Sequence, residues 1–310
     1  MIRVGIVGFG NLGKCVLERV QKEPQMQAVC VFTRRPQQVV CDVPVYDLRE
    51  ASTFAKDLDV LALCLGSRVD LPRYAPELAQ TFCTVDAFDV HAEMSSYRKS
   101  LEEENLKHQT CSVIGVGWDP GLFSVLRTYA VALNGQAIVQ TLWGKGVSQG
   151  HSNMLRQIDG VTDAVQFTVP KRGVRRRIRK GEIIGETEAH RRVCYVSTTA
   201  TAGRGRIVKE IRSIPHYFQG YDVRVHFCSQ RKVLRYRAAL PHEGFVGIAD
   251  SSNECKAGFS LKLHSNPLFT AAVTVAYLRA AVRLKELGHY GCFDVTEIPV
   301  SWLTDRKDMI

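Results

Sequence analysis

The chain has 310 residues, of which 45% are hydrophobic and 23% charged, and its formal net charge is +10. This length allows two domains with buried cores, and an ordinary composition without low-complexity tracts excludes an intrinsically disordered chain. The longest apolar run, residues 271–284, is interrupted by Arg279 and Arg283. Because that run is too short and too charged to cross a bilayer, and no export signal is visible, the sequence predicts a soluble cytoplasmic protein.

The ten cysteines are scattered singly and never form a Cys-x-x-Cys motif. In a chain without an export signal they are expected to be reduced, mostly buried thiols. The nine histidines show no metal-ligand spacing with one another or with cysteine, so no metal site is expected.

The first third of the chain alternates strand-like and helix-like segments. Short apolar runs predict the strands, and amphipathic segments between them predict the helices. The expected strands are residues 2–7, 28–33, 60–65, 84–86 and 112–115, and the expected helices are residues 12–20, 48–58, 72–82 and 91–107. This alternation predicts an α/β fold, a Rossmann-type doubly wound parallel sheet with helices on both faces.

Beyond Pro120 and the helix expected after it, strand-like segments dominate. Further strands are expected at residues 137–143, 164–169, 193–197, 221–227, 234–238 and 257–263, and helices at residues 207–212 and 266–287. These segments predict a second, α+β domain on a mixed or antiparallel sheet. The boundary is expected near Asp119.

A basic tract, residues 171–180, carries much of the net charge. Clustered lysine and arginine could bind nucleic acid by releasing counterions from phosphates. No helix-turn-helix, zinc-finger or RNA-binding motif accompanies the tract, so a solvated basic helix or loop is the favoured interpretation.

A Gly-x-Gly-x-x-Gly motif lies directly after the first expected strand and opens a helix, the context in which it indicates a dinucleotide site. In that site Gly8 allows a tight turn, Gly10 lets the backbone approach the pyrophosphate, and Gly13 lets the helix pack close to the strand. The N–H groups at the helix start, with Asn11 and Leu12, would face this anion. A glycine-rich turn without a ligand is the disfavoured alternative.

The residues after the second strand decide which dinucleotide binds. An NAD site usually has an acidic residue there, whereas this chain has Thr33, Arg34 and Arg35. Guanidinium groups pair with a 2′-phosphate through forked hydrogen bonds. The sequence therefore predicts NADP(H).

Ligands of such sheets bind beyond the carboxyl ends of the strands. The later strands end in segments 64–67, 86–89 and 115–121, which would place Asp89 and Asp119 near the nicotinamide, although either could be a helix cap. Two carboxylates beside the hydride acceptor suit a substrate with an amino group. The further residues expected to contact the cofactor are Cys64, Leu65, Gly66, Ser67, Asp86, Asp89, Gly117, Trp118, Asp119 and Pro120.

These motifs together resemble the meso-diaminopimelate dehydrogenase family, over nearly the whole chain. The most specific part is Trp-Gly-Lys-Gly-Val-Ser-Gln-Gly-His-Ser at residues 143–152, which generic dinucleotide enzymes lack. The other matching motifs are at residues 8–13, 32–35, 64–67, 84–89, 117–121, 215–221, 240–242 and 261–267.

The resemblance implies reversible, NADP-dependent oxidative deamination of the D-centre of meso-2,6-diaminopimelate, in lysine and diaminopimelate biosynthesis. The products would be L-2-amino-6-oxopimelate, which cyclises to tetrahydrodipicolinate, together with ammonia and NADPH. It also implies a homodimer. The domains would be a dinucleotide-binding domain (1–119), a substrate-binding and dimerisation domain (120–265), and a C-terminal helix and tail that pack on the first domain (266–310).

The resemblance also assigns residue roles. Asp89, Asp119 and His151 are the catalytic candidates, and the substrate-binding candidates are Asp89, Asp119, Trp143, Gln149, Gly150, Thr168, Arg192, His242 and Asn266. Arg192 can bind the distal carboxylate bidentately. The choice of Arg192 over the adjacent Arg191 depends on the family match. The segment after His242 departs from the family pattern, which puts the shape of the distal pocket in question.

In the expected mechanism the substrate amine loses a proton, hydride leaves the D-carbon, and water attacks the resulting imine. Asp89 and Asp119 would bind the amine and order the water. One alternative is another NADP-dependent amino-acid dehydrogenase or a dihydrodipicolinate-type reductase on the same scaffold. The other is a non-catalytic NADP-binding regulator that uses the basic tract on nucleic acid.

Overall fold

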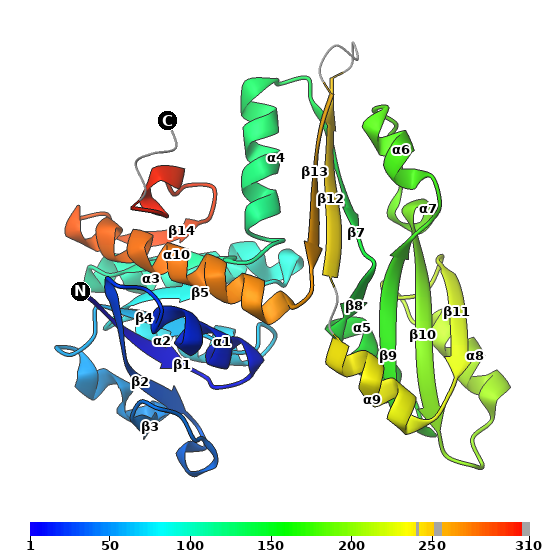
Figure 1. The fold of residues 1–310 in the computed structure, drawn as a ribbon, viewed down its shortest axis with the longest axis horizontal. Helices are drawn as coiled ribbons and strands as arrows, with labels where there is room; N and C mark the ends of the chain where they lie inside the picture. Colours follow the sequence, from blue (N-terminus) through cyan, green and yellow to red (C-terminus); the bar gives the residue numbers. More distant parts are fainter. Residues whose placement is uncertain (240–241, 251–255, 306–310) are drawn as a thin grey trace. The chain divides into compact units, whose positions relative to one another are not determined.

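The computed structural model describes residues 1–239, 242–250 and 256–305. The chain forms two compact units. The first unit consists of residues 1–128 and residues 267 onward, and the second unit consists of residues 129–266. The described segments are shown in Figure 1.

A seven-stranded parallel sheet forms the centre of the first unit, with the strand order β14-β6-β5-β4-β1-β2-β3. This order reverses direction at β1, as a doubly wound dinucleotide-binding sheet does, and it confirms the predicted fold class. The strands are β1 (Ile2–Val7), β2 (Met26–Thr33), β3 (Val45–Asp47), β4 (Val60–Leu63), β5 (Cys83–Asp86), β6 (Cys111–Ile114) and β14 (Gly291–Asp294).

Helices cover both faces of this sheet, because successive strand side chains point to opposite sides. On β4, Val60 and Ala62 pack in the cluster that contains α1 (Asn11–Val20) and α10 (Asn266–Glu286). Leu61 and Leu63 pack in the opposite cluster with α2 (Asp70–Ala79) and α3 (Met94–His108).

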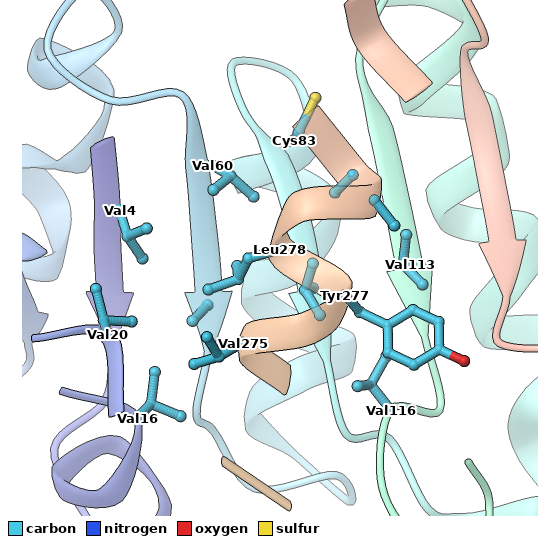
Figure 2. Packing of buried hydrophobic residues seen from close by; sticks show 14 of the residues in the cluster. Val4, Val16, Val20, Val60, Cys83, Val113, Val116, Val275, Tyr277 and Leu278 are labelled. Atoms are coloured by element: carbon cyan, nitrogen blue, oxygen red, sulfur yellow. The ribbon is translucent and has the colours of Figure 1, made fainter. Parts of the chain in front are cut away.

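Helix α10 is long and apolar enough to cross a membrane by length and composition alone, and half of its most apolar window is buried. Its Val275 and Leu278 are at most 1% exposed and lie against β1, β4 and β6 through residues such as Val4 (Figure 2). The apolar character of α10 is therefore explained by its place in the core of the first unit.

Two details of the first unit differ from the sequence-based expectation. The segment expected as a helix over residues 48–58 is a 3₁₀ helix, η2 (Leu48–Phe54), with a capping box between Asp47 and Glu50. Strand β14 was not predicted, because its sequence, Gly-Cys-Phe-Asp, has no apolar run. Two further 3₁₀ turns are η1 (Pro36–Gln38) and η3 (His91–Glu93), and a third, η4 (Val300–Trp302), follows β14.

The second unit contains two sheets, which confirms an α+β architecture on mixed and antiparallel strands. The first, mixed sheet has the order β11-β10-β9-β8, and the second, antiparallel sheet has the order β13-β12-β7. The strands are β7 (Ile138–Trp143), β8 (Gly146–Ser148), β9 (Val161–Pro170), β10 (His190–Thr198), β11 (Asp222–Phe227), β12 (His242–Ala249) and β13 (Lys256–Leu263). The helices are α4 (Leu122–Leu133), which crosses the unit boundary, α5 (Gln149–Arg156), α6 (Val174–Arg179), α7 (Glu186–Ala189), α8 (Arg204–Ser213) and α9 (Gln230–Ala239).

The strand expected at residues 234–238 is wrong, because this segment belongs to helix α9. Val233 and Tyr236 pack together against Val165 and Phe167 of β9. Their spacing of three residues is that of one helix face, whereas Lys232 and Arg235 lie outside this cluster.

The basic tract forms the short helix α6 and the turns around it. Val174 and Ile178, four residues apart, are each 3% exposed and pack with Phe245. The guanidinium groups of Arg175 and Arg179 lie 4.6 and 5.1 Å from the centre of the Phe245 ring. The tract is thus a basic helix whose apolar residues face the core, and two of its arginines cover an aromatic side chain.

Candidate functional site

A cavity of about 330 Å³ lies in the first unit, where β1, β2 and β4 end. The sheet order places these carboxyl ends at the switch point, where doubly wound sheets bind ligands. The lining comes from the segments that follow β1 and β4, from the end of β2 and η1, and from the first residues of η2 and α2: Gly8, Phe9, Gly10, Phe32, Thr33, Arg34, Arg35, Gln38, Val39, Leu48, Cys64, Leu65, Gly66 and Asp70.

A side chain would have a different consequence at each of the three motif glycines. Gly8 has φ +90°, and a Cβ there would lie 2.7 Å from the carbonyl oxygen of Cys64. A Cβ on Gly13 would lie 2.1 Å from the carbonyl oxygen of Gly8, so α1 could not pack this close to β1 with any side chain. Around Gly10, no described atom beyond its immediate chain neighbours lies within 4 Å of such a Cβ. Gly10 therefore leaves open space at the start of α1, where helix N–H groups can meet a phosphate.

Thr33, Arg34 and Arg35 line one end of the cavity, and the two arginines make this end cationic. Arg34 donates from Nη1 and Nη2 to the two carboxylate oxygens of Asp70, at 3.0 and 3.1 Å. The guanidinium group of Arg34 also lies 5.9 Å from the centre of the Tyr74 ring. A second cavity, of about 190 Å³, shares Arg34 and Leu48 with the first.

The cavity contains part of the predicted cofactor set and adds to it. Among the predicted residues, the lining includes Gly8, Gly10, Thr33, Arg34, Arg35, Cys64, Leu65 and Gly66, but not Asn11, Leu12, Gly13, Ser67, Asp86, Asp89, Gly117, Trp118, Asp119 and Pro120. Sequence reasoning missed Asp70, which begins α2 just beyond the Gly66–Ser67 turn. An acidic residue in a first helical turn is an ordinary cap signal, so nothing in the sequence marked it as a partner of Arg34.

The two candidate carboxylates differ in environment. Asp89 is exposed, and its backbone N–H donates to Ser67 Oγ at 3.3 Å. The Asp119 side chain is fully buried, and its Oδ1 accepts a hydrogen bond from Arg127 at 2.7 Å. Arg127, on α4, was not predicted as part of the site. Its position eight residues after Asp119 carried no recognisable motif.

Asp86, one of the residues expected to contact the cofactor, is buried and hydrogen-bonded within the first unit. Its side chain is 1% exposed, and it accepts hydrogen bonds from the backbone N–H of Phe88 at 2.9 Å and from the Tyr97 hydroxyl at 2.6 Å. Burial raises the pKa of Asp86 to about 6, although the hydrogen bonds oppose this shift. These partners hold the carboxylate inside the first unit.

In the second unit, Arg192 is the buried member of the Arg191–Arg192 pair, at 7% exposed. Its Nη1 donates to Thr168 Oγ1 at 2.6 Å, and its guanidinium group lies 4.1 Å from the centre of the Tyr221 ring. Its Nε is buried and has no hydrogen-bond partner among the described residues. Arg191 instead forms an ion pair with Asp222 near the surface. A buried guanidinium edge with an unused donor suits a carboxylate ligand.

The antiparallel pairing of β9 with β10 brings these side chains together. Thr168 of β9 lies opposite Arg192 of β10, and Gln166 lies opposite Cys194. Residues two apart share a face of a strand, so Gln166 lies beside Thr168 and donates to its hydroxyl at 3.4 Å. Gln166 is fully buried, and its Oε1 has no partner among the described residues. Gln166 and Tyr221 were both missed by the sequence analysis.

His151 lies on α5 and contacts the helix cap. Its Nδ1 is 2.5 Å from Ser148 Oγ, and the Ser148 side chain caps α5 by accepting from the His151 N–H. Burial lowers the pKa of His151 to about 3, and the positive charge of Arg192 adds to the shift. The imidazole is therefore neutral at physiological pH, which suits a hydrogen-bonding group better than a proton donor.

The other substrate candidates lie in the second unit on four elements, β7, α5, β12 and the first residue of α10. Trp143 ends β7, and its indole lies 6.1 Å from the His190 ring. Gln149 and Gly150 begin α5, His242 begins β12, and Asn266 follows β13. Each lies at an element end, where side chains are available to a ligand.

The nine described cysteines are all free thiols, as predicted. Cys83 and Cys111 lie side by side on β5 and β6 with their sulfur atoms 3.3 Å apart. Cys64 lines the cofactor cavity, and burial raises its pKa to about 12, which keeps it protonated.

Comparison with known proteins agrees with these features. Residues 117–265 match the family described as Diaminopimelic acid dehydrogenase C-terminal domain. The meso-diaminopimelate D-dehydrogenase of Ureibacillus thermosphaericus is 40% identical to this chain, over 99% of this chain and 96% of that protein.

Solved structures give the same result. The structure of C. glutamicum DAP dehydrogenase in complex with DAP matches with a TM-score of 0.91 and 39% identity, over 98% of this chain and 96% of that one. An engineered D-amino acid dehydrogenase bound to NADP⁺ matches with a TM-score of 0.86 and 37% identity, over 98% and 96% of the two chains. Since sequence and fold agree over nearly the full length, the chain is an oxidoreductase that belongs to the meso-diaminopimelate D-dehydrogenase family.

Proposed function

We propose that the chain catalyses the reversible, NADP-dependent oxidative deamination of meso-2,6-diaminopimelate at its D-centre. In this reaction meso-2,6-diaminopimelate, NADP⁺ and water give L-2-amino-6-oxopimelate, ammonium, NADPH and a proton. The observation that carries the proposal is the full-length similarity to meso-diaminopimelate D-dehydrogenases, one of which is 40% identical over 99% of this chain. The reverse direction would supply diaminopimelate for lysine biosynthesis.

The residues of the first unit fit NADP(H). The Gly10 position is open for a pyrophosphate, and Thr33, Arg34 and Arg35 place hydroxyl and guanidinium donors at the same cavity for a 2′-phosphate. When bound, the cofactor supplies the hydride acceptor. The protein residues bind and orient the dinucleotide through these donors.

Asp89 and Asp119 would act on the reacting amine. Before oxidation the ammonium group must lose a proton, and the carboxylates are suited to bind it and to order the water that later attacks the imine. The ion pair with Arg127 would fix the orientation of Asp119. Asp119→Ala is expected to lower turnover far more than NADPH affinity, and unchanged turnover would remove Asp119 from the mechanism.

The distal end of the substrate requires a different set of groups. We assign its carboxylate to Arg192 and Thr168, which already share a hydrogen bond of 2.6 Å, with donors from His242 and Asn266. Trp143, Gln149, Gly150 and His151 would surround the rest of the substrate. Binding of the distal carboxylate positions the D-carbon of the substrate for hydride transfer. This raises the rate because the entropy cost of orienting the substrate is met on binding.

The substrate assay is spectrophotometric. Reduction of NADP⁺ is followed with meso-diaminopimelate, its L,L isomer and simple D-amino acids as separate substrates. We expect the meso compound to be oxidised at least about a hundredfold more efficiently than the L,L isomer, because only the former has a D-centre. Equal activity with a simple D-amino acid would contradict recognition of the distal carboxylate.

We also propose a homodimer that acts in the cytoplasm. Exposed apolar residues of α4, including Tyr129, Val131 and Leu133 at 59%, 52% and 80% exposure, suit burial against another chain. Light scattering would give twice the 34.6 kDa mass of one chain for a dimer, and the mass of a single chain would contradict it.

A further inference from the structure

We infer that Asp86 is a positioning residue that holds together the two loops carrying Asp89 and Asp119. The inference rests on the proposed roles of those two carboxylates. Asp86 is the last residue of β5, and Asp89 follows three residues later. The neighbouring strand β6 ends at Ile114, and its loop leads to Asp119. Asp86 therefore lies where both loops begin.

The first loop is fixed to Asp86 through Phe88. One carboxylate oxygen of Asp86 accepts the backbone N–H of Phe88 at 2.9 Å. The other accepts the hydroxyl of Tyr97 at 2.6 Å, and the Tyr97 ring stacks on the Phe88 ring with centroids 4.1 Å apart and an angle of 15°. Both the backbone and the ring of Phe88 are thus held, and Asp89 is the next residue.

The second loop is fixed through Val116. The Val116 N–H donates to the Asp86 carbonyl oxygen at 2.9 Å. Gly115 has φ +69°, which turns the chain away from β6, and a Cβ there would lie 3.4 Å from Pro120. The segment between β6 and Asp119 therefore folds back on itself directly beside Asp86.

The energetics favour a role beyond packing. A buried carboxylate costs folding free energy unless it is hydrogen-bonded, and an apolar residue could fill the same volume at lower cost. The Asp86 carboxylate is 1% exposed and receives donors from Phe88 and Tyr97. A satisfied buried network of this kind rigidifies what it connects. Here the carboxylate holds the loop that carries Asp89, and the carbonyl oxygen of the same residue holds the loop that leads to Asp119.

The proposal is tested with Asp86→Asn and a matched control, Thr84→Val. Asparagine keeps the volume of Asp86 but weakens the bond to the backbone N–H of Phe88 by removing the charge. Thr84 lies on the same strand in an equally buried position, and among the described residues its hydroxyl bonds only to Ser112 Oγ of β6, at 2.8 Å. Thr84→Val therefore removes a buried hydrogen bond between β5 and β6 without touching either loop. Tyr97→Phe is a milder variant that keeps the ring stack.

Three quantities are measured on the full-length variants: kcat and KM for meso-diaminopimelate, NADPH affinity, and amide hydrogen exchange at residues 87–89 and 115–119. For Asp86→Asn we expect a fall in kcat of about tenfold or more, because small displacements of reacting groups are costly. NADPH affinity should stay within about threefold. Exchange should become faster at residues 87–89, and to a smaller extent at residues 115–119, which bond to the main chain of Asp86. Tyr97→Phe should show a smaller effect of the same kind, and Thr84→Val should keep wild-type kcat and exchange.

Two results would overturn the inference. One is wild-type kcat and exchange in Asp86→Asn and Tyr97→Phe. The other is an equal loss of kcat in Asp86→Asn and Thr84→Val in proportion to lost stability, which would indicate a merely structural role. If Asp86→Asn does not fold, Tyr97→Phe decides the question. Absence of wild-type activity on meso-diaminopimelate would refute the proposed function instead, and the exchange measurement would still test the link between the loops.

Discussion

The carboxylate of Asp70 holds the guanidinium group of Arg34 through two hydrogen bonds, of 3.0 and 3.1 Å, at the wall of the cofactor cavity. This pairing uses the Nη1 and Nη2 edge of Arg34. A 2′-phosphate can then use only the Nε edge or displace the carboxylate. The side chains of Arg34 and Asp70 are 56% and 22% exposed, so their ion pair is weak enough for a phosphate to compete with it.

Asp70→Asn is therefore expected to tighten NADPH binding. An exposed ion pair contributes up to about 1 kcal/mol, so freeing Arg34 should lower the Kd for NADPH by up to about fivefold. NADH lacks the 2′-phosphate, so its Kd is the internal control and should stay constant. Fluorescence titration measures both, and weaker NADPH binding in the variant would show that Asp70 orients Arg34 instead of competing with the phosphate.

The glycine motif provides a paired prediction. Gly10→Ala should fold with nearly wild-type stability, because no described atom beyond the immediate chain neighbours lies within 4 Å of the new Cβ, but the methyl group would enter the space left for the pyrophosphate. Gly13→Ala should lower the free energy of unfolding by about 1–3 kcal/mol, because its Cβ would lie 2.1 Å from the Gly8 carbonyl oxygen. Urea unfolding and NADPH titration separate the two effects. A stable Gly13→Ala protein with tight NADPH binding would contradict this account.

Arg192→Lys should raise KM for meso-diaminopimelate by about 10–100-fold, since a lost hydrogen bond to a charged group costs about 1.5–3 kcal/mol. Lysine keeps the charge but loses the forked geometry that a carboxylate matches. Arg191→Lys is the matched control, because Arg191 pairs with Asp222 and is not part of the Thr168 cluster. Steady-state kinetics should show little change in the control. Equal effects of both substitutions would place the distal carboxylate elsewhere.

His151 makes stability depend on pH. Its pKa falls from 6.5 to about 3 in the folded chain because of burial, so between these values the unfolded chain binds more protons. The contribution of the neutral His151 imidazole to the free energy of unfolding is fully present above about pH 6.5. It is lost as pH falls toward 3, by about 1.4 kcal/mol for each pH unit within that window.

The corresponding experiment compares wild type and His151→Gln by urea unfolding from pH 7 to pH 4. The difference in unfolding free energy between the two proteins should shrink as pH falls, because only the wild type loses the contribution of a neutral imidazole. Parallel pH profiles would show that His151 does not titrate differently in the folded chain.

The sequence predicted most of the first unit, because parallel strands there are continuous apolar runs and helices are amphipathic, as in β1 and α1. Strand β14 escaped prediction because its four residues contain no longer apolar run, and its pairing with β6 is visible only in the structure. In the second unit, α9 resembled a strand because Leu234, Tyr236 and Ala238 alternate with two arginines in the sequence, whereas in the structure Val233 is buried and Tyr236 half-buried on one helix face. The residues 240–241 within the matched motif at 240–242 lie outside the described residues.

Site residues in motifs were predictable, and their partners were not. Thr33, Arg34 and Arg35 followed from their place after β2 and do line the cavity. Asp70 is remote in sequence from Arg34, and Arg127 from Asp119, so only the tertiary structure brings these charges together. Asp86 was expected to contact the cofactor because it ends a strand. Its side chain is 1% exposed, which its position at a strand end did not indicate.

The most direct test of the central claim is oxidation of NADPH in the presence of tetrahydrodipicolinate, with and without ammonium. An enzyme that forms the D-centre of meso-diaminopimelate must incorporate nitrogen, so NADPH oxidation should depend on ammonium and yield the meso product. Oxidation that proceeds equally well without ammonium would contradict this account and would indicate a simple reductase.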